Sequence, residues 1–150
     1  MTDEDFADYW TFLVKRKQES TYDDLLEDER IFYAANIFRG SVLRSGLIGY
    51  FENTECEVIR GTHHALSMLG LSDALKLLQD SQRIILKGDP LPETDQFVTL
   101  FNYDLPEEEV EKAMDDLDRL VQDVQDQLYL QDQAIFDSLC RFADQRKLHA

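Results

Sequence analysis

Apolar residues recur at intervals of three and four along most of this chain, the spacing of one face of an α-helix. The first such stripe consists of Phe6, Tyr9, Trp10, Leu13 and Val14. Thr2 precedes it and is a good N-cap, because its hydroxyl can accept from the amide near Asp5. No segment alternates apolar and polar residues as an exposed strand does. The pattern predicts an all-α fold, with residues 1–150 forming one domain of six to eight helices.

Glycines and polar caps divide the middle of the chain into further helices. One helix is expected to start near Asp28, and Ser45-Gly46 marks a break after it, because glycine tolerates backbone conformations that other residues avoid. A short helix over residues 47–51 is then closed by Asn53. A helix over residues 55–69 ends at Gly70, and the next is capped by Ser72 and ends at Gly88.

Residues 88–106 contain all three prolines and are the only long irregular segment expected. Pro106 is well placed near a helix start, where its missing N–H does no harm. Apolar side chains in this segment are expected to pack on the core: Phe97, Val98, Leu100, Phe101 and Tyr103. The segment is therefore predicted to be an ordered connection, with room for a helical turn.

The C-terminal third combines an apolar stripe with an unusual excess of acids. Its stripe is Val110, Met114, Leu117, Val121, Val124 and Leu128. Eleven carboxylates fall between residues 107 and 137: Glu107, Glu108, Glu109, Glu111, Asp115, Asp116, Asp118, Asp123, Asp126, Asp132 and Asp137. The acids therefore belong to one long amphipathic helix near the C-terminus. A last helix is expected to carry Ile135, Leu139 and Phe142.

Two interpretations of the acidic helix are open. Alternating charges favour a solvated face stabilised by ion pairs; they are Glu109, Lys112, Asp116, Arg119 and Asp123, with further pairs expected for Glu108–Lys112 and Asp115–Arg119. Two bases cannot neutralise eleven acids, however. A second stripe contains Glu108, Glu111, Asp115 and Asp118. Each of its steps advances about 5 Å along the helix, similar to the spacing of phosphates along one DNA strand. The second interpretation is therefore that this face occupies the basic groove of a DNA-binding protein.

Composition and charge narrow the classes of partner. Apolar residues make up 43% of the chain, so it can build a core despite a net charge of −16. A pI near 4.4 argues against direct binding to nucleic acid or to anionic membranes, because like charges repel. No apolar run approaches a membrane span. The acidic start lacks the features of a secretory signal, and Cys56 and Cys140 lack CxxC spacing. We therefore expect a cytoplasmic protein with reduced thiols.

The sequence contains no motif of a known catalytic or nucleotide-binding site. His63 and His64 are adjacent, so on a helix they point about 100° apart and do not easily grip one metal ion. Cys56 and His63 lie seven residues apart, which is far for a single ion. We predict that the protein is not an enzyme and holds no cofactor or metal.

Residues 29–35, 42–46, 50–53 and 65–71 together resemble a family of small acidic all-α bacterial proteins. One branch of that family is described as dimeric DNA mimics that occupy the DNA-binding surface of a transcription factor. The chain carries Arg44-Ser45-Gly46 where the family pattern has Asn-Gly-Gly, so only the last glycine is retained. The matching residues are mainly of structural type: Gly46 as a turn, Tyr50 and Phe51 as core, and Asn53 as a cap.

The resemblance and the acidic helix together favour a protein-interaction module that acts as a DNA mimic in transcription regulation. Its partner would be a basic DNA-binding protein, and a homodimer is compatible with the resemblance. The expected partner-binding residues are Glu108, Glu111, Asp115, Asp116, Asp118, Asp123 and Asp126. The alternatives are an immunity or antitoxin-like protein that blocks a basic nuclease or toxin, and a small-molecule-binding protein or hydrolase.

Overall fold

A computed structural model describes residues 1–93 and 96–149, and every regular element in them is helical. The α-helices are α1 (Asp3–Glu19), α2 (Glu27–Asn53), α3 (Cys56–Met68), α4 (Ser72–Ile85) and α5 (Glu107–Arg146), with a short 3-10 helix η1 (Tyr22–Asp24) between α1 and α2. The predicted all-α class is confirmed. The described residues form five α-helices, so the prediction of six to eight was too high.

The predicted break at Ser45-Gly46 is confirmed, because the backbone of Gly46 is non-helical, and the predicted short helix over residues 47–51 follows it as the last part of α2. A second pair of predicted helices is not divided. The acidic helix and the predicted last helix form α5, which has 40 residues. Neither glycine nor proline lies inside α5, and its buried side chains keep helical spacing from Val121 through Leu128 to Ile135 and Leu139. Because the same stripe remains buried, nothing requires the helix to end.

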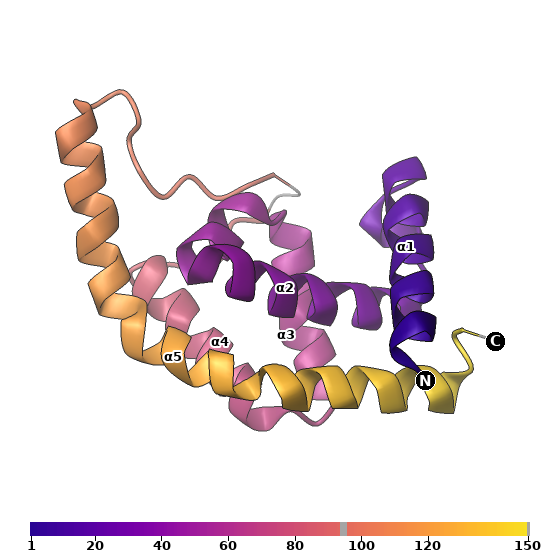
Figure 1. Cartoon of the computed structure of the whole chain (residues 1–150). Helices are drawn as coiled ribbons and strands as arrows, with labels where there is room; N and C mark the ends of the chain where they lie inside the picture. Colours follow the sequence, from indigo (N-terminus) through magenta and orange to yellow (C-terminus); the bar gives the residue numbers. More distant parts are fainter. Residues whose placement is uncertain (94–95, 150) are drawn as a thin grey trace.

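Helix α2 lies in the middle of the molecule, with α3 and α5 packed against it and α4 against α3 and α5 (Figure 1). Its large aromatic side chains are buried, and the ring of Tyr50 meets that of Phe38 with centroids 5.0 Å apart. Tyr50 donates a hydrogen bond of 2.9 Å to Thr62 of α3, so the hydroxyl is paired inside the core. The core is thus centred on α2 and closed by the C-terminal half of α5.

Helix α1 stands at the end of the molecule where α5 finishes (Figure 1). The Thr2 hydroxyl accepts from the Asp5 amide at 3.0 Å, which confirms the predicted N-cap. Phe6 packs between Phe32 of α2 and Phe136 of α5, with ring centroids 5.2 Å and 4.7 Å away. This aromatic contact joins the N-terminal helix to both helices of the core.

The connection between α4 and α5 is irregular, as predicted, and hydrogen bonds hold it to the helices beneath. The Cys56 amide donates to the Gln96 carbonyl at 3.0 Å, and the Tyr103 hydroxyl donates to Glu52 of α2 at 2.6 Å. Phe101 is buried, but Phe97 and Tyr103 are more than half exposed, so the expectation that they pack on the core was wrong. Chain segments held by main-chain and hydroxyl hydrogen bonds need not bury every aromatic ring.

Two predicted caps differ by one position. Ser72 is the first residue of α4, and Leu71 is its N-cap. Asn53 is the last residue of α2, which is capped by Thr54. Among the described residues, no helix is both long and apolar enough to cross a membrane.

Candidate protein-interaction surface on helix α5

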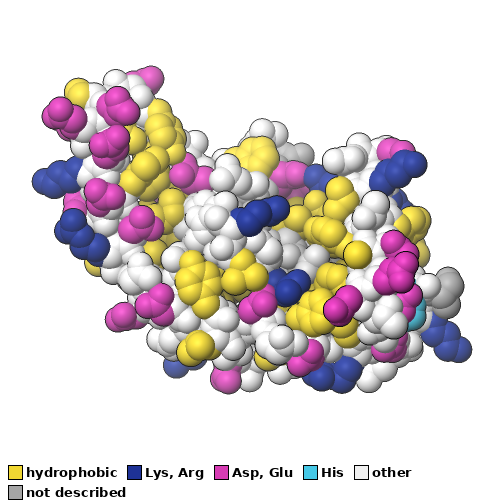
Figure 2. Space-filling view, viewed as in Figure 1, with side chains coloured by type: hydrophobic (Ala, Val, Ile, Leu, Met, Phe, Trp, Pro, Cys, Tyr) yellow, Lys and Arg dark blue, Asp and Glu magenta, His cyan; other side chains and the backbone are white. Residues whose placement is uncertain are grey.

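The first part of α5 projects from the body of the molecule (Figure 1). We call residues 107–121 the arm. α5 bends beyond the arm and then runs along α2 toward the C-terminus. Figure 2 shows acidic side chains on the outside of the arm and apolar side chains on the side that faces the body. The arm therefore keeps the amphipathic division predicted from its sequence, although its inner side faces less of the protein than the rest of α5 does.

All of the acids expected to bind a partner are exposed. They are Glu108, Glu111, Asp115, Asp116, Asp118, Asp123 and Asp126. The apolar stripe opposite them is buried at Val110 and Val121 and half-buried at Leu117. Exposure follows from the helical period, because the carboxylates occupy the positions between those that turn inward.

The predicted ion pairs are mostly not formed. Arg119 contacts Asp116 at 3.6 Å, one turn away, rather than Asp115. Within the described part of the chain no ion pair neutralises Glu108, Glu111, Asp115 or Asp118, and Lys112 pairs with none of them. An exposed pair gains little and costs side-chain freedom, so its absence is physically ordinary. The consequence is a row of four carboxylates whose field is not cancelled by adjacent cations, and we call these four the acidic row.

Helical geometry places the acidic row along one side of the arm. Steps of three, four and three residues keep the four side chains on one face, about 5 Å apart along the axis. Lys112 and Arg119 are seven residues apart and share a neighbouring face. Glu109, Asp116 and Asp123 lie beyond these two bases. The arm thus presents two lines of carboxylates with a basic line between them.

Gln125 connects the base of the arm to the break in α2. Gly46 has φ +71° and ψ −177°, a conformation outside the helix, so the following amide loses its intrahelical acceptor. The Leu47 amide instead donates to Oε1 of Gln125 at 2.8 Å. Leu47 is fully buried, so water could not replace this acceptor. The hydrogen bond therefore joins the bend of α5 to the central helix.

Replacing Gln125 with alanine should lower the free energy of unfolding by about 1–3 kcal/mol, because the buried Leu47 amide would lose its acceptor. Gln127→Ala is the matched control: Gln127 lies on the same helix and is exposed, so its effect should stay within about 0.5 kcal/mol. Urea denaturation followed by circular dichroism measures both. Equal stabilities for the two variants would contradict the assigned role.

The other motif residues have structural surroundings. Tyr50 and Phe51 are fully buried, and their rings meet edge to face with centroids 5.3 Å apart. Asn53 is exposed at the end of α2. These three residues thus belong to the core and to a helix end, and the acidic row lies on another element.

The histidines and cysteines are dispersed. His63 hydrogen-bonds Gln82 at 2.7 Å, and His64 lies 3.7 Å from Glu27. Cys56 is buried, and burial raises the pKa of its thiol. Among the described residues, no three side chains of histidine, cysteine, aspartate or glutamate come together in a way that could hold a metal ion.

Comparison with known proteins identifies the family. A family model described as DMP19-like protein matches residues 23–146, and the chain belongs to this family. The match includes all of α5 as well as the region around Gly46. Neither the curated proteins nor the solved structures contain a match to this chain.

Proposed function

We propose that this protein is a DNA mimic whose acidic arm occupies the DNA-binding surface of a basic DNA-binding protein, such as a transcription factor. The observation that carries the proposal is the acidic row: four exposed carboxylates on one helix face without an ion pair among the described residues. In this proposal the protein acts by binding and carries out no reaction.

The rigidity of the arm supports the proposal. Charges on a continuous helix keep fixed spacing, whereas charges on a disordered tail adapt to any surface. A fixed line of carboxylates about 5 Å apart offers a basic protein the anionic pattern that it meets on a DNA strand. The same line would steer the partner toward the arm, because exposed charges act mainly on the rate of encounter.

The repulsion between neighbouring carboxylates of the acidic row, which lowers the stability of the helix, also supports the proposed function. Like charges at positions i and i+4 destabilise a helix by about 0.2–0.5 kcal/mol per pair. Glu111 and Asp115 stand in this relation, and the chain provides Lys112 and Arg119 without directing either to them. A surface that served only solubility could reach the same net charge with fewer adjacent acids.

The proposal is tested with a variant that removes the field and keeps the helix: Glu108→Gln, Glu111→Gln, Asp115→Asn and Asp118→Asn. A pull-down from host lysate at low and high salt supplies the partner, and surface plasmon resonance then measures its binding to the purified proteins. The variant should lose at least about tenfold in association rate, and its binding should depend less on salt. Double-stranded DNA should compete with the wild-type protein for the partner.

A control variant separates the local pattern from net charge. Glu4→Gln, Asp8→Asn, Glu19→Gln and Asp23→Asn remove four exposed acids from other parts of the chain and change the net charge equally. This control should bind nearly as wild type does. The proposal is wrong if the two variants bind alike, or if DNA and this protein bind the partner together. A captured nuclease or toxin that DNA does not displace would instead favour an immunity protein.

A further inference from the structure

The acidic row leads along α5 to an exposed apolar surface. α5 bends beyond the arm, and steps of four, four and three residues from Asp118 then follow one helix face through Gln122 and Asp126 to Tyr129. Gln122 donates to Asp126 at 2.8 Å, so the polar line remains ordered up to this point. Asp126 and Tyr129 are about 4.5 Å apart along the helix axis. The last carboxylate of the line therefore stands directly beside Tyr129.

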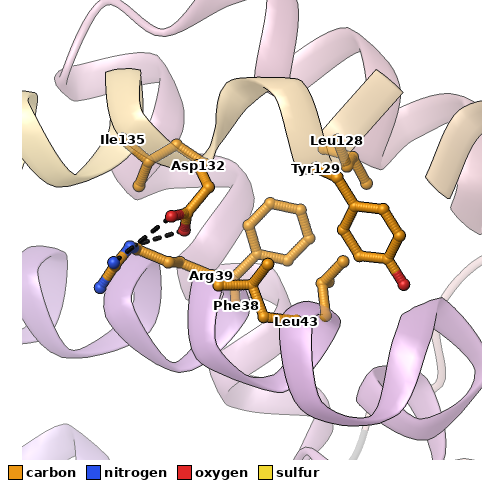
Figure 3. A pocket seen from close by; sticks show the side chains of 8 residues that line it. Phe38, Arg39, Leu43, Leu128, Tyr129, Asp132 and Ile135 are labelled. Carbon is orange, nitrogen blue, oxygen red and sulfur yellow. Dashed lines mark hydrogen bonds and ion pairs between the residues drawn. The ribbon is translucent and has the colours of Figure 1, made fainter. Parts of the chain in front are cut away.

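Tyr129 forms a shallow apolar surface with Leu43 of α2 (Figure 3). Tyr129 is 38% exposed and Leu43 is 48% exposed. Beneath them lie Phe38, Leu128 and Ile135, all buried. We call the exposed sides of Leu43 and Tyr129, together with this floor, the apolar anchor site.

A charged pair closes the other side of the anchor site. Nε of Arg39 lies 2.7 Å from Oδ1 of Asp132, and its guanidinium lies over the ring of Phe136 at 4.7 Å. Figure 3 shows this pair opposite Tyr129 and Leu43. Because Asp132 is already paired with Arg39, its carboxylate is not available to a basic residue of a partner. The space between the walls is only about 10 Å³, so an incoming side chain would pack on Leu43 and Tyr129 from outside.

We propose that the anchor site takes one aliphatic side chain of the basic partner, placed one helical turn beyond the basic residue that faces Asp126. This inference rests on the proposed function. The charge complementarity of the adjacent carboxylates selects a basic segment as the occupant. Exposed ion pairs contribute little affinity each, whereas a buried apolar contact centred on tyrosine is the usual source of binding energy at an interface.

The charges and the apolar contact are expected to affect different rate constants of binding. Charges set the association rate and its salt dependence, and the apolar contact sets the dissociation rate. A plain DNA molecule has no side chain to place on Tyr129 and Leu43. The anchor site would therefore let the partner distinguish this protein from DNA, which a carboxylate row alone does not do.

Two isomeric synthetic helical peptides test the proposal. Both peptides carry lysines at steps of three and four residues and a single leucine. In the same-face peptide the leucine lies one turn beyond the last lysine on the face of the lysines. In the other peptide it lies on the opposite face. Fluorescence polarisation at about 0.1 M salt should show the same-face peptide binding about tenfold more tightly to the wild-type protein, which corresponds to about 1.4 kcal/mol. Tyr129→Ala and Leu43→Ala should each reduce that ratio toward one.

Leu130→Ala is the matched control, because Leu130 is 81% exposed on the same helix and faces away from the anchor site. It should leave the tenfold ratio unchanged. Equal affinities of the two peptides for the wild-type protein overturn the anchor, even if binding stays salt-dependent and the acidic row keeps its proposed function. No binding of the same-face peptide also overturns it. Sedimentation gives a further check: a dimer that Tyr129→Ala converts to monomer would show a second copy on this surface, against our proposal.

Discussion

Replacing Gly61 with alanine should lower the free energy of unfolding by about 1–3 kcal/mol. Gly61 lies in α3 against the buried ring of Tyr22, and a Cβ atom at this position would stand 2.8 Å from Cζ of that ring, with the hydroxyl closer still. No real side chain contacts a Cβ at that distance, so the helix or the ring must move. Urea denaturation with circular dichroism measures the loss.

Gly40→Ala provides the control for this prediction. Gly40 lies inside α2, and a Cβ there would have no heavy atom within 4 Å. Alanine should therefore raise stability by about 0.5–1 kcal/mol through helix propensity. In a Tyr22→Leu background the Gly61→Ala change should cost less, because the obstructing ring is gone. Equal costs in both backgrounds would show that Tyr22 is not the cause.

Gly46→Val should lower stability by at least about 1–3 kcal/mol. At φ +71° and ψ −177° the backbone of Gly46 occupies a region that is nearly reserved for glycine, and valine is branched at Cβ. The added Cβ would also stand 2.6 Å from Oε1 of Gln125, disturbing the hydrogen bond to Leu47. Thermal unfolding followed by circular dichroism measures the change.

Gly40→Val is the control for Gly46→Val, because it places the same branched side chain inside a regular part of α2 with open space around it. Its cost should be within about 1 kcal/mol of zero. A Gly46→Val protein with an unchanged melting temperature would contradict the backbone argument. If that protein also lost its partner, the break in α2 would have a direct part in binding.

Much of the fold could be predicted because local patterns determine it. The helical spacing of apolar residues identified the helical class, and short-range chemistry identified Thr2 as a cap. Gly70 follows the C-cap of α3 with φ +70°, as its position after the apolar stripe suggested. α4 ends earlier than predicted, at Ile85, and Lys87 rather than Gly88 is the first residue after it with a positive φ. Each of these features depends on residues within about one turn of one another.

Features that depend on distant residues could not be predicted in this way. The continuity of α5 requires that its core stripe find partners on both α2 and α4, which the local spacing does not reveal. Gln125 is one of several glutamines in α5, and nothing in the sequence distinguishes it before α2 is placed beside it. The anchor site likewise combines Leu43 and Tyr129, which are far apart in the chain.

In the candidate site, too, one feature could be predicted from the sequence and another could not. Exposure of the seven acids followed from the helical period. The ion pairs did not, because Arg119 had carboxylates within reach both three and four residues away and contacts Asp116. Energies of such exposed pairs differ by a few tenths of a kcal/mol, which is too little for sequence spacing to select one of them.

A single continuous helix carries both the acidic arm and part of the core, so the length of α5 constrains how the protein can evolve. Substitutions on the outer face leave the helix register intact. An insertion of one residue between Asp118 and Val121, however, would turn the acidic row by about 100° relative to the stripe that packs on α2. We therefore expect related chains to vary in residue type along the arm and to keep the number of residues between the row and Gln125.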